Sequence, residues 1–325
     1  MRILVTGGTG VIGSWVTRRL VQMGEKPVVL TSRGDTSLIA DVASAVTVES
    51  GDVRDLGRLM RIVHTHRIDC IVHFAALMPP QCQADPVAAF EVNCRGTLHV
   101  LEAARSLGVR RVVYASAKGV YGVVPPPWGH PDFQPIDEEF PKNPVSVYDG
   151  TKLFGEHLGE NYRRNYGLEF VSLRFATTYG PGKLARHGPL SIHSKLIENA
   201  MLGRPSRGVR GADQRDDMIY MADVAQGVVQ ATLATTLPHS VYHLGSGRLS
   251  TLREVAAAIW RLYPEAEIEL EPGLDYLGLG LGYSLYDCSR AMNELGYRPE
   301  YDVERGVADY VETMQHLGIA PTYTP

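Results

Sequence analysis

The sequence has few of the features that mark membrane, secreted or nucleic-acid-binding chains. Its four cysteines, at positions 70, 82, 94 and 288, lack the paired spacing of a metal site, so we expect free thiols and no metal. No run of about 18 apolar residues is present, which excludes a membrane-spanning helix. The formal net charge of −4 supplies no basic field for nucleic acid or an anionic membrane. A strand pattern starts at residue 2 and leaves no room for a signal peptide, so we expect a cytoplasmic protein with a small-molecule substrate.

What the sequence does contain is a regular alternation of short apolar strands and amphipathic helices. Hydrophobic residues make up 44% of the 325, enough to bury a sizeable core. Strands are predicted at residues 2–6, 27–32, 46–49, 69–75, 111–116 and 168–175, and helices at 12–23, 56–66, 86–107 and 145–166. This order predicts an α/β fold with a doubly wound parallel sheet, whose ligands bind beyond the carboxyl ends of the strands.

The alternation loosens after residue 175. Residues 1–175 are predicted to form a dinucleotide-binding domain, and residues 176–325 mainly a smaller C-terminal substrate-binding lobe laid over the strand ends. Segments of about 212–245, where a helix and a strand pattern recur, are expected to return to the first domain. The proline-rich stretch 125–144 cannot be regular helix and is expected to form a wall or lid of the site.

The first strand runs into a glycine turn at residues 6–13, Thr-Gly-Gly-Thr-Gly-Val-Ile-Gly, which opens the first helix. Gly7 can adopt a turn angle closed to other residues, and Gly10 lets the backbone approach a pyrophosphate. The helix N-terminus, with the N–H groups of Val11 and Ile12, faces that pyrophosphate. The turn therefore predicts a dinucleotide site, and the alternative is a tight turn that binds nothing.

The end of the second strand carries the residues that select the cofactor. An acidic residue at this place accepts hydrogen bonds from the ribose of NAD. Thr31, Ser32 and Arg33 stand here instead, and Arg33 can pair with the 2′-phosphate of NADP. NADP is therefore slightly favoured over NAD, and the nearby Asp35 keeps NAD open.

Two more strand ends are expected at the cofactor. Asp52 and Val53 follow the third strand, and Asp52 can accept a hydrogen bond from the adenine amino group. Ala75 and Ala76 follow the fourth strand, where small side chains let the backbone lie against a bound molecule. Both places lie at the carboxyl edge that a doubly wound sheet uses for binding.

Tyr148 and Lys152 are the best candidates for chemistry. They are four residues apart on a predicted helix and therefore lie on one face, one turn apart. The lysine ammonium and a positively charged nicotinamide favour the phenolate of Tyr148. Tyr148 can then exchange a proton with an alcohol or ketone while hydride moves between carbon and nicotinamide, and Lys152 can also hold the nicotinamide ribose.

These motifs together resemble the extended short-chain dehydrogenase/reductases, the NAD-dependent epimerase/dehydratase group typified by UDP-glucose 4-epimerase. The matching stretches, in family order, are residues 6–13, 51–53, 73–76, 93–97, 114–122, 148–152, 173–181, 219–225, 243–247 and 295–297. The resemblance implies a Rossmann-type domain, a nicotinamide cofactor and a substrate pocket made with the C-terminal lobe. It also implies Asn93 at the cofactor, and a homodimer formed through the helices at 86–107 and 145–166.

The sequence departs from this family at the catalytic hydroxyl. Ala117 stands where the family has a Ser or Thr that polarises the substrate carbonyl, and Ser116 is the nearest replacement. The loss of such a donor costs about 10² to 10³ in rate. Lys118 and Gly119 stand where the 4,6-dehydratases have an acidic pair, which argues against dehydration. Ala117 and Lys118 are nonetheless expected in the substrate site.

The substrate side also departs from the family. Thr177 replaces an Asn, and Asp216 replaces an Arg that clamps the diphosphate of a nucleotide sugar. Asp216 is expected to repel a diphosphate, with the adjacent Arg215 as possible compensation. Arg186 and His187, on a loop after the sixth strand, could bind the carboxylate of a smaller substrate or could be surface charges.

The leading hypothesis is an NAD(P)-dependent oxidoreductase acting on a secondary alcohol or ketone of a sugar-like or hydroxy-acid substrate. Tyr148 is its acid/base, Lys152 assists, and Ser116 is the hydroxyl in question. One alternative is a nucleotide-sugar epimerase with tightly bound NAD. The other is a non-catalytic dinucleotide-binding sensor, suggested by Ala117.

Overall fold

The main sheet of the computed structural model contains seven strands in the order β10-β6-β5-β4-β1-β2-β3, and the structure describes residues 1–188, 191–278 and 282–324. The strands are β1 (Ile3–Thr6), β2 (Val28–Thr31), β3 (Thr47–Ser50), β4 (Cys70–His73), β5 (Arg111–Ala115), β6 (Glu169–Phe175) and β10 (Val241–Leu244). Every neighbouring pair is parallel. The predicted doubly wound α/β fold is confirmed.

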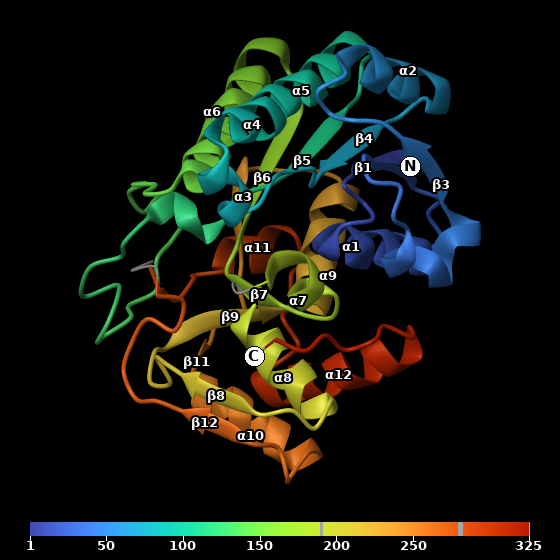
Figure 1. Cartoon of the computed structure of the whole chain (residues 1–325). Coiled ribbons are helices and arrows are strands. Elements are labelled where there is room, and N and C mark those ends of the chain that lie inside the picture. The colour runs from blue at the N-terminus through green and yellow to red at the C-terminus, as the bar shows by residue number, and fades with distance from the viewer. Residues whose placement is uncertain (189–190, 279–281, 325) are drawn as a thin grey trace.

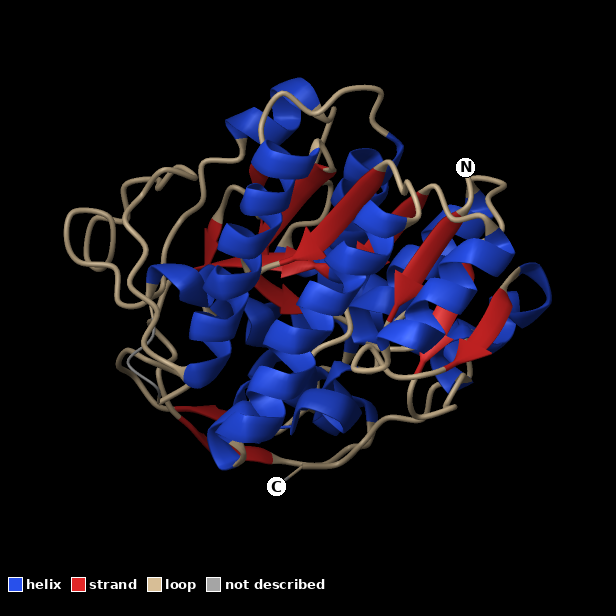
Figure 2. Cartoon of the chain, turned by 90° about the horizontal axis from the view of Figure 1, so that it is seen from above, coloured by secondary structure: helices blue, strands red, loops and turns tan. Residues whose placement is uncertain are grey.

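Helices cover both faces of this sheet (Figures 1 and 2). On one face pack α2 (Leu56–His66), α5 (Gly96–Ser106) and α6 (Val147–Tyr166), and on the other α1 (Val11–Gln22), α9 (Met221–Leu233) and α11 (Ser289–Glu294). The alternation of side chains along a strand explains the two cores. In β1, Ile3 and Val5 pack with α1 and α9, whereas Leu4 packs with α2 and α5.

The C-terminal lobe lies below the strand ends in Figure 1 and has its own core. It contains a three-stranded sheet of β7 (Thr177–Tyr179), β9 (Asp216–Tyr220) and β11 (Leu249–Ser250), and a strand pair of β8 (Ser206–Val209) and β12 (Ile268–Leu270). Its helices are α7 (Lys183–His187), α8 (Ile192–Met201), α10 (Leu252–Leu262) and α12 (Val303–His316). Within the expected returning segment, α9 and β10 join the main sheet and β9 stays in the lobe.

The helix predicted at 86–107 is interrupted. It consists of α4 (Pro86–Ala89), a π-helical segment over Phe90–Arg95 and then α5. The wider turn breaks the 3.6-residue spacing, a local change that hydrophobic periodicity does not reveal. Short elements that were not predicted are the 3₁₀ segments Ser37–Ala45 and Lys118–Tyr121 and the helix α3 (Pro79–Ala84).

The proline-rich stretch 125–144 is a long loop without regular helix, as expected. It packs against the segment before α11, because Ile136 donates its N–H to the Leu285 carbonyl (2.9 Å) and Asp287 donates to the Ile136 carbonyl (2.8 Å). It does not line the main cavity, so the expectation of a wall there is wrong. Among the described residues, no helix combines the length and the apolar character that crossing a membrane requires.

Candidate active site

A cavity of about 360 Å³ lies at the carboxyl ends of β1, β2, β3, β4 and β5. The structure brings to it these residues singled out in the sequence: Gly7, Gly10, Val11, Ile12, Thr31, Ser32, Arg33, Asp52, Val53, Ala75, Ala76, Ser116, Tyr148, Lys152, Arg186 and His187. Asn93, Ala117, Lys118 and Thr177 are not part of its lining. The predicted dinucleotide turn and the predicted Tyr-Lys pair therefore face one space.

The glycine turn fits a phosphate group. Gly7 has a positive φ of 68°, and a Cβ on Gly13 would lie 2.2 Å from the Gly7 carbonyl oxygen, which a side chain cannot tolerate. Helix α1 begins at Val11 after Gly10, whose position offers no side-chain cap. The first N–H groups of α1 thus have no intrahelical acceptor and point to the cavity, as a pyrophosphate requires.

The end of β2 presents one free cation. Arg33 is exposed and has no polar partner among the described residues. Asp35 accepts a hydrogen bond from Arg186 at 2.5 Å. Hydrogen bonds from Ser37, with the charge of Arg186 in addition, keep the pKa of Asp35 below its ordinary value. Arg186 is therefore held at the adenosine side, which corrects the expectation that it binds a substrate carboxylate.

His187 lines the cavity, but as a neutral ring. Burial, together with the nearby charges of Lys183 and Arg186, lowers the pKa of His187 to about 3. Its Nδ1 atom is buried without a hydrogen-bond partner. His187 can therefore offer a substrate a hydrogen bond from a neutral ring, and its predicted contact with a substrate carboxylate stays a prediction.

Tyr148 and Lys152 lie on α6, which begins after Ser146, whose hydroxyl accepts the Asp149 N–H at 3.1 Å. Lys152 donates from Nζ to the carbonyl of Ala115 at 2.7 Å, and that nitrogen lies 5.5 Å from the centroid of the Tyr148 ring. The end of β5 thus fixes the ammonium beside the phenol.

Burial decides the charge states of this pair. It lowers the pKa of Lys152 to about 8 and raises the pKa of Tyr148 above its ordinary value, with the charge of Asp149 as a second cause. The phenol is therefore neutral in the cofactor-free protein, and the phenolate that the sequence predicts for the pair of Lys152 and an oxidised nicotinamide stays a prediction. Tyr148 is poised as a proton donor.

Ser116 lines the cavity, but its hydroxyl proton is already used. Its Oγ donates to Glu156 at 2.5 Å, and Glu156 in turn accepts two hydrogen bonds from Arg174, at 2.9 and 2.5 Å. All three side chains are buried. A hydroxyl that donates into the protein cannot also donate to a substrate carbonyl, so the expected catalytic role of Ser116 is not supported.

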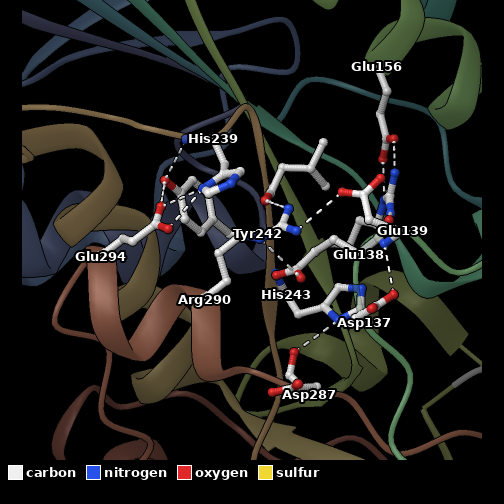
Figure 3. A network of polar contacts seen from close by, with 12 residues as sticks. Asp137, Glu138, Glu139, Glu156, His239, Tyr242, His243, Asp287, Arg290 and Glu294 are labelled. Carbon is white, nitrogen blue, oxygen red and sulfur yellow. Dashed lines mark hydrogen bonds and ion pairs between the residues drawn. The ribbon is translucent and has the colours of Figure 1, made fainter.

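The Glu156–Arg174 pair continues into a buried network that sequence reasoning missed. Arg174 donates to the hydroxyl of Tyr121 (2.6 Å) and to the Glu138 carbonyl (2.8 Å). Tyr121 also shares a hydrogen bond with Nε2 of His243. The backbone N–H of His243 donates to the carboxylate of Glu138. Figure 3 shows the network around Glu138 and His243. The spacing of Glu156 four residues after Lys152 was the one available signal.

Lys118 and Thr177 form a second buried network, between β9 and the end of β5. Lys118 contacts Asp216 at 2.8 Å, and the Thr177 hydroxyl donates to the same carboxylate at 2.5 Å. Tyr276 also donates to Asp216 at 2.8 Å, and Asp216 is 0% exposed. The expectation that Asp216 repels a diphosphate is therefore wrong, because Lys118 neutralises it. Lys118 and Thr177 are correspondingly not free for substrate.

The two other expected residues also lie outside the lining. Ala117 precedes the 3₁₀ segment at the end of β5. The amide of Asn93 accepts the Leu77 N–H (2.7 Å) and donates to the Leu77 carbonyl and to Thr151 (3.1 Å each). Asn93 thus holds the cavity wall after β4 against α6, and its predicted contact with a cofactor stays a prediction.

Arg215 does not compensate for Asp216 at the substrate side. Its guanidinium donates to the Pro131 carbonyl at 2.5 Å and lies 4.8 Å from the centroid of the Phe133 ring. It therefore anchors the long loop 125–144. Strand β9 itself contains no arginine.

Comparisons with known proteins agree with this geometry. Residues 3–245 match the model of the NAD dependent epimerase/dehydratase family. The chain is 31% identical over 322 residues to a UDP-glucose 4-epimerase of Rhizobium leguminosarum bv. trifolii, covering 93% of each. It superposes on the Thermus thermophilus UDP-glucose 4-epimerase complex with NAD with a TM-score of 0.80 and 31% identity, covering 98% and 100% of the two chains. For the Thermotoga maritima enzyme with UDP-glucose, the TM-score is 0.84 at 25% identity, covering 97% and 99%.

Proposed function

Because the chain belongs to the NAD-dependent epimerase/dehydratase family, we propose that it is an NAD(P)-dependent oxidoreductase that uses Tyr148 as its acid/base. The substrate is a secondary alcohol or ketone of a small polar molecule, sugar-like or a hydroxy acid. The observation that carries this proposal is the shared cavity, in which Tyr148 and Lys152 face the glycine turn at residues 6–13.

The residues of this chain divide the work of proton transfer. Tyr148 donates its phenolic proton to the oxygen of a ketone, or takes the proton back from the alcohol in the reverse direction. Lys152 is held by Ala115 at 2.7 Å and keeps a positive charge beside the ring. When bound, the nicotinamide ring returns or takes hydride at the substrate carbon, and its positive charge in the oxidised form favours the phenolate.

The decisive experiment replaces the phenol. Tyr148→Phe removes one oxygen and should lower turnover by about 10² to 10⁴, the range for a lost general acid/base. Cofactor affinity should stay within a few-fold of wild type, because the glycine turn is unchanged. Tyr166→Phe, an exposed tyrosine on the last turn of the same helix, is the matched control. A Tyr148→Phe variant with wild-type turnover would rule out this mechanism.

A small substrate is favoured over a nucleotide sugar because the family's diphosphate-clamping arginine is replaced by Asp216, whose neighbouring cation is already paired with it. Asp216 occupies that place and is neutralised by Lys118 at 2.8 Å. Arg215 is turned to the Pro131 carbonyl. A diphosphate would thus enter without an arginine clamp, which is a costly way to bury two charges.

A nucleotide-sugar epimerase is the second candidate, favoured by the identity of 31% with UDP-glucose 4-epimerases. In such a cycle the cofactor stays bound and is regenerated. Calorimetry with UDP tests it: binding below millimolar concentration, together with stoichiometric NAD released on denaturation, would support the epimerase. A purified protein that carries no NAD and does not bind UDP at millimolar concentration would eliminate the epimerase.

For the cofactor itself, we propose NADP over NAD. Arg33 is exposed without a polar partner among the described residues, and Asp35 is occupied by Arg186 at 2.5 Å. The usual acidic acceptor of the NAD ribose is replaced by Thr31, which accepts a hydrogen bond from the Thr9 hydroxyl at 3.1 Å. These features favour a 2′-phosphate.

We also propose a homodimer. Apolar side chains on α4, the π-helical segment, α5 and α6 are exposed, namely Val87, Phe90, Leu98 and Phe154. These helices lie together on the outer face in Figure 1, away from the C-terminal lobe. An exposed apolar surface of this kind is typical of a protein interface.

A further inference from the structure

Lys183, the first residue of α7, is a buried cation without an acidic partner. Its side chain belongs to a residue that is 8% exposed, and Nζ donates to the Thr178 carbonyl and, at 3.1 Å, to the Thr178 hydroxyl. Among the described residues, no carboxylate lies within ion-pair distance of it. Burying an ammonium against neutral oxygens alone costs free energy, so this place favours an added negative charge.

His193, on α8, is a second buried side chain near this place, and it lacks hydrogen-bond partners. It is 1% exposed, and neither Nδ1 nor Nε2 has a hydrogen-bond partner. Its ring lies edge-on to Tyr276, with centroids 5.4 Å apart. Both nitrogens of a buried histidine are almost always satisfied in a folded protein, so an orphaned ring indicates a missing ligand. Burial lowers its pKa, and the ammonium groups of Lys183 and Lys118 contribute to that shift.

The cluster consists of Lys183, His193, Lys118 and Asp216, and its charges add up to a single positive charge. Lys118 is neutralised by Asp216 at 2.8 Å, whereas Lys183 is not neutralised. Asp217, the next residue on β9, faces the other side of the strand and accepts hydrogen bonds from Ser246 at 2.7 Å. One uncompensated cation matches a monoanion such as a carboxylate. It does not match a diphosphate, which brings two charges or more.

The cluster adjoins the main cavity. His187 lies in the cavity lining, and Lys183 lies one turn earlier on the same face of α7. Lys118 lies two residues after Ser116, which also lines the cavity. Lys183 and His193 do not themselves line this cavity, so the cluster lies behind its His187 edge.

We propose that Lys183 and His193 form the subsite that binds the carboxylate of the substrate, which is therefore a hydroxy acid such as a sugar acid. This inference rests on the proposed function, because it places the acid in the same cavity as Tyr148. The ammonium of Lys183 pairs with one carboxylate oxygen, and an N–H of His193 donates to the other. The secondary alcohol of the acid is then oriented toward Tyr148.

The test compares binding of an acid with that of its neutral counterpart to the cofactor-loaded protein. D-Glucuronate and D-gluconate are titrated by calorimetry against D-glucose and UDP, with Lys183→Met and with Lys26→Met as the exposed-lysine control. We expect an acid of this panel to bind more tightly than D-glucose. Lys183→Met should weaken that binding by about 30-fold or more, the range for losing one member of a buried charge pair. Lys26→Met should leave it unchanged.

His193→Phe, which keeps an aromatic ring and removes both nitrogens, gives a second variant if Lys183→Met does not fold. Equal affinity of the acids for wild type and for both variants overturns the proposal. So does a panel in which D-glucose binds as tightly as either acid, or in which neither acid binds. UDP binding that is lost in Lys183→Met assigns the subsite to phosphate and overturns the carboxylate assignment. Tyr148→Phe is expected to keep acid binding and lose turnover. A Tyr148→Phe variant with wild-type turnover would overturn the proposed function without touching the carboxylate subsite, so the two failures are distinguishable.

Discussion

The hydroxyl of Ser116 donates to the carboxylate of Glu156 at 2.5 Å, although Ser116 lines the cavity that holds Tyr148. Glu156 lies one turn after Lys152 on α6, and it also holds the guanidinium of Arg174. The serine nearest to the expected catalytic position is thus part of the supporting structure behind the site. Several consequences of this arrangement can be measured.

Ser116→Ala should reduce turnover less than about tenfold, because a hydroxyl committed to Glu156 does not polarise the substrate. Removal of a true oxyanion donor instead costs about 10² to 10³. Steady-state kinetics on the same substrate for Ser116→Ala and for Tyr148→Phe distinguish a supporting role of the Ser116 hydroxyl from a catalytic one. A loss of 10²-fold or more in kcat for Ser116→Ala would restore its catalytic role.

Glu156→Gln should destabilise the fold by about 3–5 kcal/mol, since it leaves the buried Arg174 charge without a counter-charge. Glu160→Gln, one turn later on α6, is the matched control. Glu160 pairs with Arg163 and Arg164 near the surface, so its loss should cost about 1 kcal/mol or less. Urea unfolding followed by circular dichroism measures both. Equal effects of the two substitutions would show that the buried pair contributes no more than the surface one.

Lys152→Met should abolish turnover and raise the stability of the cofactor-free protein at pH 7. Burial lowers the pKa of Lys152 from 10.5 to about 8, so holding its charge costs about 3 kcal/mol. Between pH 8 and 10 the unfolded wild-type chain binds this proton and the folded one does not, so wild-type stability rises with pH there. The stability of Lys152→Met relative to wild type, measured by thermal unfolding, should therefore decrease across that pH range. A constant advantage would contradict the shifted pKa.

Arg33→Ala should weaken NADP binding by about 10- to 100-fold, as expected for losing a charge-assisted hydrogen bond, and leave NAD binding nearly unchanged. Arg54→Ala is the control, because Arg54 lines the same cavity but is paired with Asp52 at 2.8 Å. Fluorescence titration with NADPH and NADH gives both affinities. Tighter binding of NADH than NADPH by the wild type would refute the proposed preference.

Phe90→Glu combined with Phe154→Glu should convert a dimer into monomers, because the two rings are 55% and 44% exposed and their helices share the outer face. Placing charges in an apolar interface leaves them desolvated without partners. Sedimentation velocity measures the mass. Trp260→Glu, at a 39% exposed tryptophan on α10, is the control and should not change it. A wild type that sediments as a monomer would refute the homodimer.

Most of the dinucleotide half followed from local sequence. The continuous apolar run of Ile3, Leu4 and Val5 is typical of a strand buried on both faces, and the glycines at 7, 10 and 13 predict a close backbone turn. Both are determined by residues that are neighbours in the chain, so no tertiary information is needed. The bounds of α2, predicted and observed at residues 56–66, follow for the same reason.

The partners of charged side chains depended on the tertiary structure. Lys118 and Asp216 are 98 residues apart, and Arg186 and Asp35 are 151 apart, so their pairing requires β9 and α7 to be docked on the strand ends. Sequence alone treated Asp216 as a free charge that repels a diphosphate and Arg186 as a free charge that binds substrate. Docking of the C-terminal lobe pairs these charges instead, because an unpaired buried charge costs free energy.

The chemical types at the site were therefore determined by the sequence: a glycine turn, a tyrosine with a lysine one turn later, and no carboxylate at the end of β2. Which of these groups remain free was decided only by packing. Tertiary burial keeps the Tyr148 phenol neutral, and packing engages Ser116 with Glu156. It also leaves Lys183 without a carboxylate partner among the described residues and His193 without a hydrogen-bond partner. The cost of desolvating a charge depends on every element that covers it, and those elements come from all parts of the chain.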